Sequence, residues 1–294
     1  MAQKGEKQMN WIAQKSAQFF ITIFVLIAIS ALPSLVVQLE FVPSNYWHGI
    51  QQQFSQLAKL DEITYFNVTA QRELPLLPDL APLMKETVII FVTSLIVSVG
   101  FALLYAYFFY RSGKRVRTVL QQTSQTLEMI PDLFWLIFSQ FLAITIYKKT
   151  GFDRIEVAGG FAEYIRFLPI VTLTLTILFF FLKWLTKHIL EEEVSLFLEL
   201  ARAKGVRPAA LFWRHLLPNL VYRFYLFFRS NLITVLSSLL IIEYLFNVQG
   251  IFRFAVYNPV MPILLVILLV VYIPIFILDL LAEWIIPNAW KGGI

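Results

Sequence analysis

Cysteine is absent from this chain of 294 residues, and charged residues make up only 15% of it. Without thiols, the chain can form no disulfide, no thiolate zinc site and no cysteine nucleophile. An ordinary soluble domain carries about 25% charged residues. The low charge content therefore argues against a water-soluble protein.

Several catalytic and nucleotide-binding motifs are also missing. The sequence contains no G-x-x-x-x-G-K-[ST] phosphate loop, no H-E-x-x-H zinc motif and no G-x-S-x-G nucleophile elbow. His48, His188 and His215 are scattered and do not group with carboxylates at metal-ligand spacing. We therefore expect no catalytic, metal or cofactor site in this chain, and any ATP-driven role would need a separate ATPase.

Hydrophobic residues make up 59% of the chain, and 28 of its residues are phenylalanine. The apolar residues come in long runs, and a run of about 20 residues crosses a bilayer as a helix. The formal net charge is +5. The basic residues lie in short segments between apolar runs rather than in one stripe, so we expect contact with membrane lipid and not with nucleic acid. The pattern predicts an all-α, polytopic membrane protein.

Six transmembrane helices are expected, and the fifth is the most polar. Their predicted ranges are Ala17–Leu39, Val88–Tyr110, Met129–Tyr147, Phe167–Leu185, Phe224–Phe246 and Met261–Leu281. Basic residues gather in the segments that are cytoplasmic when the N-terminus lies inside, which places both termini in the cytoplasm. These residues are Lys4, Lys7, Lys15, Arg111, Lys114, Arg115, Arg117, Lys183, Lys187, Arg202, Lys204, Arg207, Arg214, Arg223, Arg229 and Lys291.

The predicted spans divide the chain into four parts. Residues 1–39 hold an N-terminal tail and the first span, and residues 40–86 form an extracytoplasmic loop with an amphipathic middle at Trp47–Leu60. Residues 87–285 form the main transmembrane domain, and 286–294 a cytoplasmic tail. The outer loop is expected to cap the outer face or to meet a partner.

The cytoplasmic segment of about residues 186–222 predicts two short helices joined at a glycine. A helix-forming run from Glu199 to Lys204 ends at Gly205, where a positive φ is easily adopted. Pro208 suits the first turn of a second helix that extends to Leu217, and Pro218 is expected to end it before the next span. Such an element is suited to lie against a partner.

This segment resembles the EAA loop, or coupling helix, of bacterial ABC importer permeases. That pattern is Glu-Ala-Ala, three residues, Gly, nine residues, Ile, one residue and Leu-Pro. The sequence departs from it at Leu200 and His215. The matching or equivalent positions are Glu199, Ala201, Arg202, Lys204, Gly205, His215, Leu217 and Pro218.

Further residues resemble the oligopeptide, dipeptide and nickel permease branch. They are Ala201–Gly205, Arg214–Asn219, Glu243–Asn247 with Gly250, and Ile130-Pro131 with Phe134-Trp135, within a likeness that covers about residues 85–285. The resemblance implies a permease subunit in the bacterial cytoplasmic membrane, working with a second and different permease subunit. It also implies two cytoplasmic ATPases that bind the ATP, and an extracytoplasmic solute-binding protein. Short peptides are the expected cargo, with nickel or another small solute as alternatives.

Polar residues on the fifth span have two interpretations. Asn231, Thr234 and Ser238 fall on one helical face, where they could line the substrate pathway or form interhelical hydrogen bonds. Glu128 and Asp132 stand four apart on one helical face and are expected at a solvated helix entrance rather than as an acid/base pair. Glu191–Glu193 is expected to be solvated, with contact to basic residues of the ATPase as the alternative. An ion-coupled secondary transporter is the alternative to an ABC permease, although Glu243 and Asp279 lie near span ends rather than mid-membrane.

Overall fold

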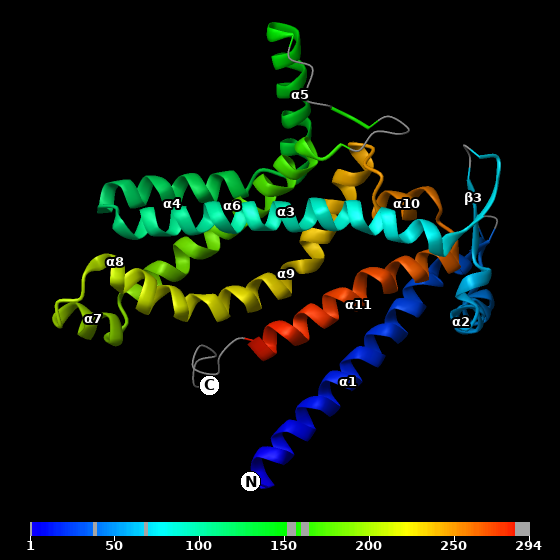
Figure 1. Ribbon diagram of the computed structural model, residues 1–294, viewed down its shortest axis with the longest axis horizontal. Coiled ribbons are helices and arrows are strands. Elements are labelled where there is room, and N and C mark those ends of the chain that lie inside the picture. Colours follow the sequence, from blue (N-terminus) through cyan, green and yellow to red (C-terminus); the bar gives the residue numbers. More distant parts are fainter. Residues whose placement is uncertain (1, 38–39, 68–69, 152–156, 160–164, 286–294) are drawn as a thin grey trace. The chain divides into compact units, whose positions relative to one another are not determined.

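Long apolar runs form long helices in the computed structural model, which describes residues 2–37, 40–67, 70–151, 157–159 and 165–285 (Figure 1). The main helices are α1 (Ala2–Ser30), α2 (Pro43–Leu57), α3 (Leu76–Arg111), α4 (Lys114–Glu128), α5 (Asp132–Thr150), α6 (Phe167–Glu193), α7 (Leu196–Ala203), α8 (Pro208–Leu211), α9 (Leu217–Leu245), α10 (Ile251–Tyr257) and α11 (Met261–Ile285). Strands are confined, among the described residues, to two short antiparallel pairs. The predicted all-helical class is therefore confirmed.

Five helices are long and apolar enough to cross a membrane, and a sixth span results if the bent pair α4 and α5 is counted as one. The helices α6 and α11 begin at Phe167 and Met261, the residues at which the sequence places their first turns. The predicted polytopic membrane protein with about six spans is thus confirmed.

Two span boundaries near the N-terminus differ from the prediction. The first helix ends at Ser30 rather than Leu39, because Pro33 follows and the chain turns into a 3₁₀ segment (Leu32–Leu35). The second begins at Leu76, well before the expected Val88. Pro78 lies in its first turn, where a missing N–H is harmless, and Pro82 is accommodated inside the helix. Proline alone therefore did not mark a loop here.

The third predicted span is broken at its beginning. Helices α4 and α5 meet at an angle of 92°, and Figure 1 shows α5 standing off almost at a right angle to α4. Pro131 has an extended backbone (φ −59°, ψ 145°) and precedes the first residue of α5. A residue before proline avoids helical geometry, so the helix stops and restarts in a new direction.

The described residues divide into two compact units, and each is described by itself. One runs to Met84 and includes Phe254–Ile285. In it α1 packs against α11, and Ile27, Ala31, Ile50 and Leu265 form a small buried cluster. Lys15 Nζ lies 2.6 Å from Glu283 Oε1 and 3.4 Å from Asp279 Oδ2, so an ion-paired group joins the two helices.

The same unit contains the two strand pairs, which the sequence did not reveal. β1 (Val36–Val37) pairs with β2 (Glu40–Phe41), and β3 (Thr64–Asn67) pairs with β4 (Arg72–Pro75). Tyr65 on β3 donates a hydrogen bond of 2.5 Å to Asp79 Oδ2. Burial, with Asp79 beside it, raises the pKa of Tyr65 above its ordinary value. The predicted amphipathic middle of this region is α2.

The second unit, Lys85–Arg253, holds the larger core. Its helices α3, α4, α5, α6 and α9 meet around buried side chains such as Phe181, Leu173 and Leu239. Short polar side chains cross between helices where they pack closely: Ser98 Oγ donates to the Thr174 carbonyl at 3.0 Å, and Ser139 and Thr172 share a hydrogen bond of 2.9 Å. Such bonds contribute about 0.6–2 kcal/mol each in a membrane.

Candidate coupling loop and translocation pathway

The helix α7 ends at Ala203 and is followed by a Schellman motif at Gly205. Gly205 has φ +75°, a left-handed conformation that side chains disfavour. Its N–H donates to the Arg202 carbonyl at 2.9 Å, and the N–H of Val206 donates to the Ala201 carbonyl at 3.2 Å. These two bonds are the 5→2 and 6→1 pair of that motif, and they satisfy carbonyls that the helix end leaves free. The expectation of a positive φ at Gly205 is confirmed.

One side of this loop is buried in the core of its unit. Leu198 and Ala201 on α7 belong to the same buried cluster as Leu211 and Phe212, and Val206 packs against that cluster. The rings of Tyr107 and Phe212 lie 5.2 Å apart in an edge-to-face arrangement. Because the buried side chains come from several helices, the loop has a fixed position on its unit.

The other side of α7 faces away from the core. Leu196 and Leu200 have 78% and 62% of their surface exposed. Among the predicted coupling residues, Ala201 is buried; four are exposed, and they are Glu199, Arg202, Lys204 and Gly205. The exposed face of this loop therefore combines apolar side chains with charges of both signs.

The second short helix does not stop at Pro218, contrary to expectation. The helix α8 continues through a π-helical segment (Phe212–Leu216) into α9, so Pro208–Leu245 is one helical run. The Leu217 N–H donates to the Phe212 carbonyl, five residues back. The wider turn precedes Pro218, which lies in the first turn of α9, where its missing N–H and its ring are tolerated. His215, Leu217 and Pro218 are half-buried in this run rather than displayed with α7.

Two ion pairs fix the end of α6, from which the loop starts. Arg117 on α4 donates to Glu193 through both terminal nitrogens, at 2.6 and 2.9 Å. Arg223 on α9 lies 2.6 Å from the buried Glu192. The expectation that Glu191–Glu193 is a solvated run is therefore wrong for two of its three residues. Sequence reasoning missed these pairs because their partners lie far away along the chain.

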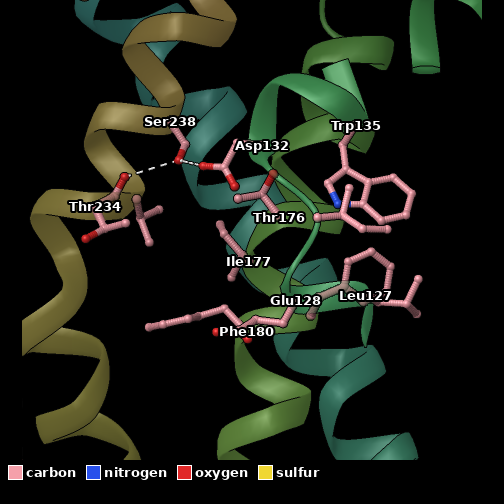
Figure 2. Close-up of a pocket in the computed structure, with 12 residues that line it drawn as sticks. Leu127, Glu128, Asp132, Trp135, Thr176, Ile177, Phe180, Thr234 and Ser238 are labelled. Carbon is pink, nitrogen blue, oxygen red and sulfur yellow. Dashed lines mark hydrogen bonds between the residues drawn. The ribbon is translucent and has the colours of Figure 1, made fainter. Parts of the chain in front are cut away.

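A cavity of about 230 Å³ lies between α4, α5, α6 and α9 within the second unit (Figure 2). Of the predicted pathway residues, Thr234 and Ser238 line it, together with Asp132, Thr176 and Trp135. Asn231 does not line it, and its side-chain amide donates instead to the Phe227 carbonyl at 2.8 Å and to Ser230 Oγ at 3.1 Å. The helical face predicted from sequence is thus only partly a cavity wall.

Ser238 also crosses between helices. Its hydroxyl donates to the Asp132 carboxylate at the start of α5, as Figure 2 shows, and to the Thr234 carbonyl at 3.2 Å. The interhelical bond proposed as the structural alternative is therefore present. Glu128 lies across the bend from Asp132 and pairs with Lys183 at 2.7 Å. The two carboxylates do not share a helical face, because Pro131 breaks the helix between them.

Glu243 is fully buried near the end of α9 and accepts three hydrogen bonds. Thr87 Oγ1 donates to its carboxylate at 2.6 Å, and the backbone N–H groups of Phe252 and Arg253 donate at 2.9 and 3.1 Å. A Cβ at Gly250 would overlap this carboxylate. The position near a span end agrees with the sequence analysis, but the burial and the contact with Gly250 were not foreseen. Among the described residues, no group of three or more His, Asp or Glu side chains could hold a metal ion.

A scan against protein families matches residues 98–291 to the binding-protein-dependent transport system inner membrane component. The chain belongs to this family. The match takes in the whole coupling loop, the cavity-lining helices α4, α5, α6 and α9, and the segment from Glu243 to Gly250. A search of curated proteins finds no significant match.

This permease is therefore a membrane-spanning subunit of an ABC importer in the inner, or cytoplasmic, membrane. It forms the translocation path and does not itself hydrolyse ATP, which a separate ATPase subunit handles. An ion-coupled secondary transporter is set aside by the family assignment. The first 97 residues, with α1, α2 and both strand pairs, lie outside the matched region.

Proposed function

We propose that this permease imports short peptides and that α7 with Gly205 is its docking element for the ATPase. The observation that carries the docking proposal is the division of α7 into two faces. Leu198 and Ala201 are buried in the core, while Leu196, Glu199 and Leu200 remain exposed. An exposed apolar patch rimmed by charges fits a protein interface better than a water-facing surface.

Rigidity at the loop is needed for coupling. A partner can shift a conformational equilibrium only through contacts that differ between its two states. Three features keep the loop from deforming on its own. They are the buried side of α7, the Schellman motif at Gly205, and the ion pairs of Glu192 and Glu193. Movement of the ATPase would therefore reach α6 and α9 rather than dissipate in the loop.

The pathway is proposed to pass the cavity that Thr234 and Ser238 line. Polar residues inside a membrane usually face a cavity or another helix, and Ser238 does both. Asn231 does not contribute to this pathway, because its amide is hydrogen-bonded within α9.

The assembly is proposed to contain a second, different permease subunit, two ATPases and one extracytoplasmic binding protein. The N- and C-termini are placed in the cytoplasm, following the distribution of basic residues. Residues 87–285 are proposed as the transport domain, residues 1–39 as a tail with the first span, residues 40–86 as an extracytoplasmic loop, and 286–294 as a cytoplasmic tail that lies outside the described residues.

The peptide assignment is supported by the likeness at Glu243–Asn247 and Gly250 to peptide and nickel permeases. The test is uptake into proteoliposomes that contain the complete transporter and its binding protein. Labelled di- and oligopeptides should enter in an ATP-dependent manner, whereas nickel ions should not. ATP-dependent entry of nickel alone would overturn the peptide assignment and leave the family membership intact.

The docking role has a separate test based on the missing cysteines. Because the chain has no cysteine, Leu200→Cys introduces a single thiol on the exposed face of α7. A short crosslinker should join it to a cysteine placed in the helical surface of the ATPase, in an ATP-dependent yield. Phe138→Cys, on the exposed face of α5, is the matched control and should give no such product. If both variants give equal yields of the crosslinked product, α7 is not the docking element.

A further inference from the structure

The segment that follows α1 is depleted in charge. From Leu32 to Leu57, Glu40 is the only formally charged side chain, and α2 itself carries none apart from the titratable His48. Soluble globular domains carry about 25% charged residues. The segment is therefore unlike an ordinary water-facing loop.

The helix α2 is tied to the end of the first span. Tyr46 Oη donates a hydrogen bond of 2.9 Å to the Ala28 carbonyl, in the last turns of α1. Ile50 packs with Ile27 and Ala31 of α1 and with Leu265 of α11. Figure 1 shows α2 where α1 ends and α11 begins. These contacts hold α2 beside the end of α1 and the start of α11.

A second face of α2 is aromatic and uncovered. Trp47 and Phe54 have 60% and 49% of their surface exposed. They stand seven positions apart, which is close to two helical turns, so both lie on one side of the helix. Gln52 and Ser55 are exposed on another side. The helix therefore has a core face, an aromatic face and an uncharged polar face.

Exposed apolar side chains also occur on α1 and on the residues that connect it to α2. Phe20, Phe24 and Ile29 on α1 are exposed, and only 6% of this span's apolar window is buried. The connecting residues Leu32, Val36 and Phe41 are exposed as well, at 47%, 55% and 70%. Exposed apolar side chains are therefore found on the membrane-spanning helix, on the connecting residues and on α2.

We propose that α2 is an interfacial helix whose Trp47–Phe54 face lies in the headgroup region of the lipid leaflet where α1 ends. Trp side chains favour this region because their rings are apolar and their N–H groups can still reach polar partners. An amphipathic helix with an apolar face buries that face at the boundary between headgroups and acyl chains. The near absence of charge disfavours electrostatic recognition by a soluble partner and favours contact with lipid.

The test measures membrane depth with single cysteines. Trp47→Cys and Phe54→Cys are labelled with a nitroxide in the complete transporter, reconstituted in phosphatidylethanolamine and phosphatidylglycerol vesicles. Gln52→Cys and Ser55→Cys are the matched controls on the polar face of the same helix. Power saturation with oxygen and with a water-soluble nickel chelate then reports depth at each position. ATP-dependent uptake by each labelled variant verifies that the transporter has folded.

The proposal expects the ratio of oxygen to nickel-chelate accessibility to be several-fold higher at positions 47 and 54 than at 52 and 55. Equal, water-like accessibility at all four positions would overturn it. Shielding of 47 and 54 from both reagents would also overturn it, because that pattern indicates a protein contact. Repeating the measurement with and without the binding protein identifies that protein as the contact if the shielding depends on it.

Discussion

Arg117 on α4 and Glu193 at the end of α6 form a two-point ion pair, with N–O distances of 2.6 and 2.9 Å. Arg117 Nε also donates to the Phe109 carbonyl at 3.0 Å, and a further terminal N–H reaches the Tyr110 carbonyl. One side chain therefore joins the end of α3, the start of α4 and the end of α6. The helix α7 starts three residues after Glu193.

Replacing Arg117 with Leu should destabilise the permease by about 2–3 kcal/mol, because Glu193 and two carbonyls then lose a charged donor. Thermal unfolding in detergent measures the change. Lys187→Ala is the control, since Lys187 and its partner Glu191 are largely exposed and 3.9 Å apart. An exposed pair of this kind contributes about 0–1 kcal/mol. Equal losses of thermal stability in the two variants would contradict a stabilising role of the Arg117–Glu193 pair.

Replacing Gly205 with Ala should weaken the coupling of ATP hydrolysis to uptake. A Cβ at this position meets no atom within 4 Å, so the only penalty is the positive φ of +75°. That conformation costs a side chain about 1–2 kcal/mol. The alanine variant should hydrolyse ATP with reduced transport per ATP in reconstituted vesicles.

Gly113→Ala is a matched control for Gly205→Ala. Gly113 also has open space at its Cβ position, but its φ is −74°. Alanine adopts this conformation without strain, and uptake should equal that of the unaltered permease. If the two alanine variants transport equally well, then the bend at Gly205 is not what coupling depends on.

Replacing Thr234 with Phe should reduce uptake several-fold, because an aromatic ring would fill much of the cavity of about 230 Å³. Ile233→Phe places the same ring on the next residue, whose side chain is 79% exposed. This control should leave transport within a factor of about two, as expected for substitutions away from packed sites. Both variants are measured by peptide uptake at matched protein levels. If Thr234→Phe leaves peptide uptake unchanged, the cavity is not part of the pathway.

Replacing Gly250 with Ala should destabilise the region around Glu243. The added methyl group would overlap the Glu243 carboxylate, which hydrogen bonds to Thr87, Phe252 and Arg253 hold in place. Overpacking of this kind costs about 1–3 kcal/mol. Gly100→Ala is the control, because a Cβ there meets no atom within 4 Å. The temperature of thermal unfolding should fall for Gly250→Ala and should be unchanged or higher for Gly100→Ala. A Gly250→Ala variant as stable as the parent would show that the Glu243 side chain moves aside without loss.

Sequence patterns predicted the features that depend on neighbouring residues. The starts of α6 and α11 follow from the onset of apolar runs, and the bend at Gly205 follows from the conformational freedom of glycine. Proline was less informative, because its effect depends on context. Pro131 broke a helix, whereas Pro82 and Pro218 were accommodated within helices.

Contacts between distant segments were beyond the reach of local patterns. Glu193 was expected to be solvated, and its partner Arg117 lies 76 positions away in the chain. Ser238 and Asp132 are 106 positions apart, so their hydrogen bond depends on how α5 and α9 pack. Periodicity specifies a face of one helix, but it does not specify which helix lies opposite.

The unbroken helical run from Pro208 to Leu245 joins α8, which follows the proposed docking element α7 and Gly205, directly to a transmembrane span. Its 38 residues correspond to about 57 Å of helix at 1.5 Å per residue. No loop separates α8 from α9 within this run, so a displacement of α8 is transmitted directly to α9. The run contains the π-helical segment Phe212–Leu216, and single-turn π segments of this kind are frequent at functional sites.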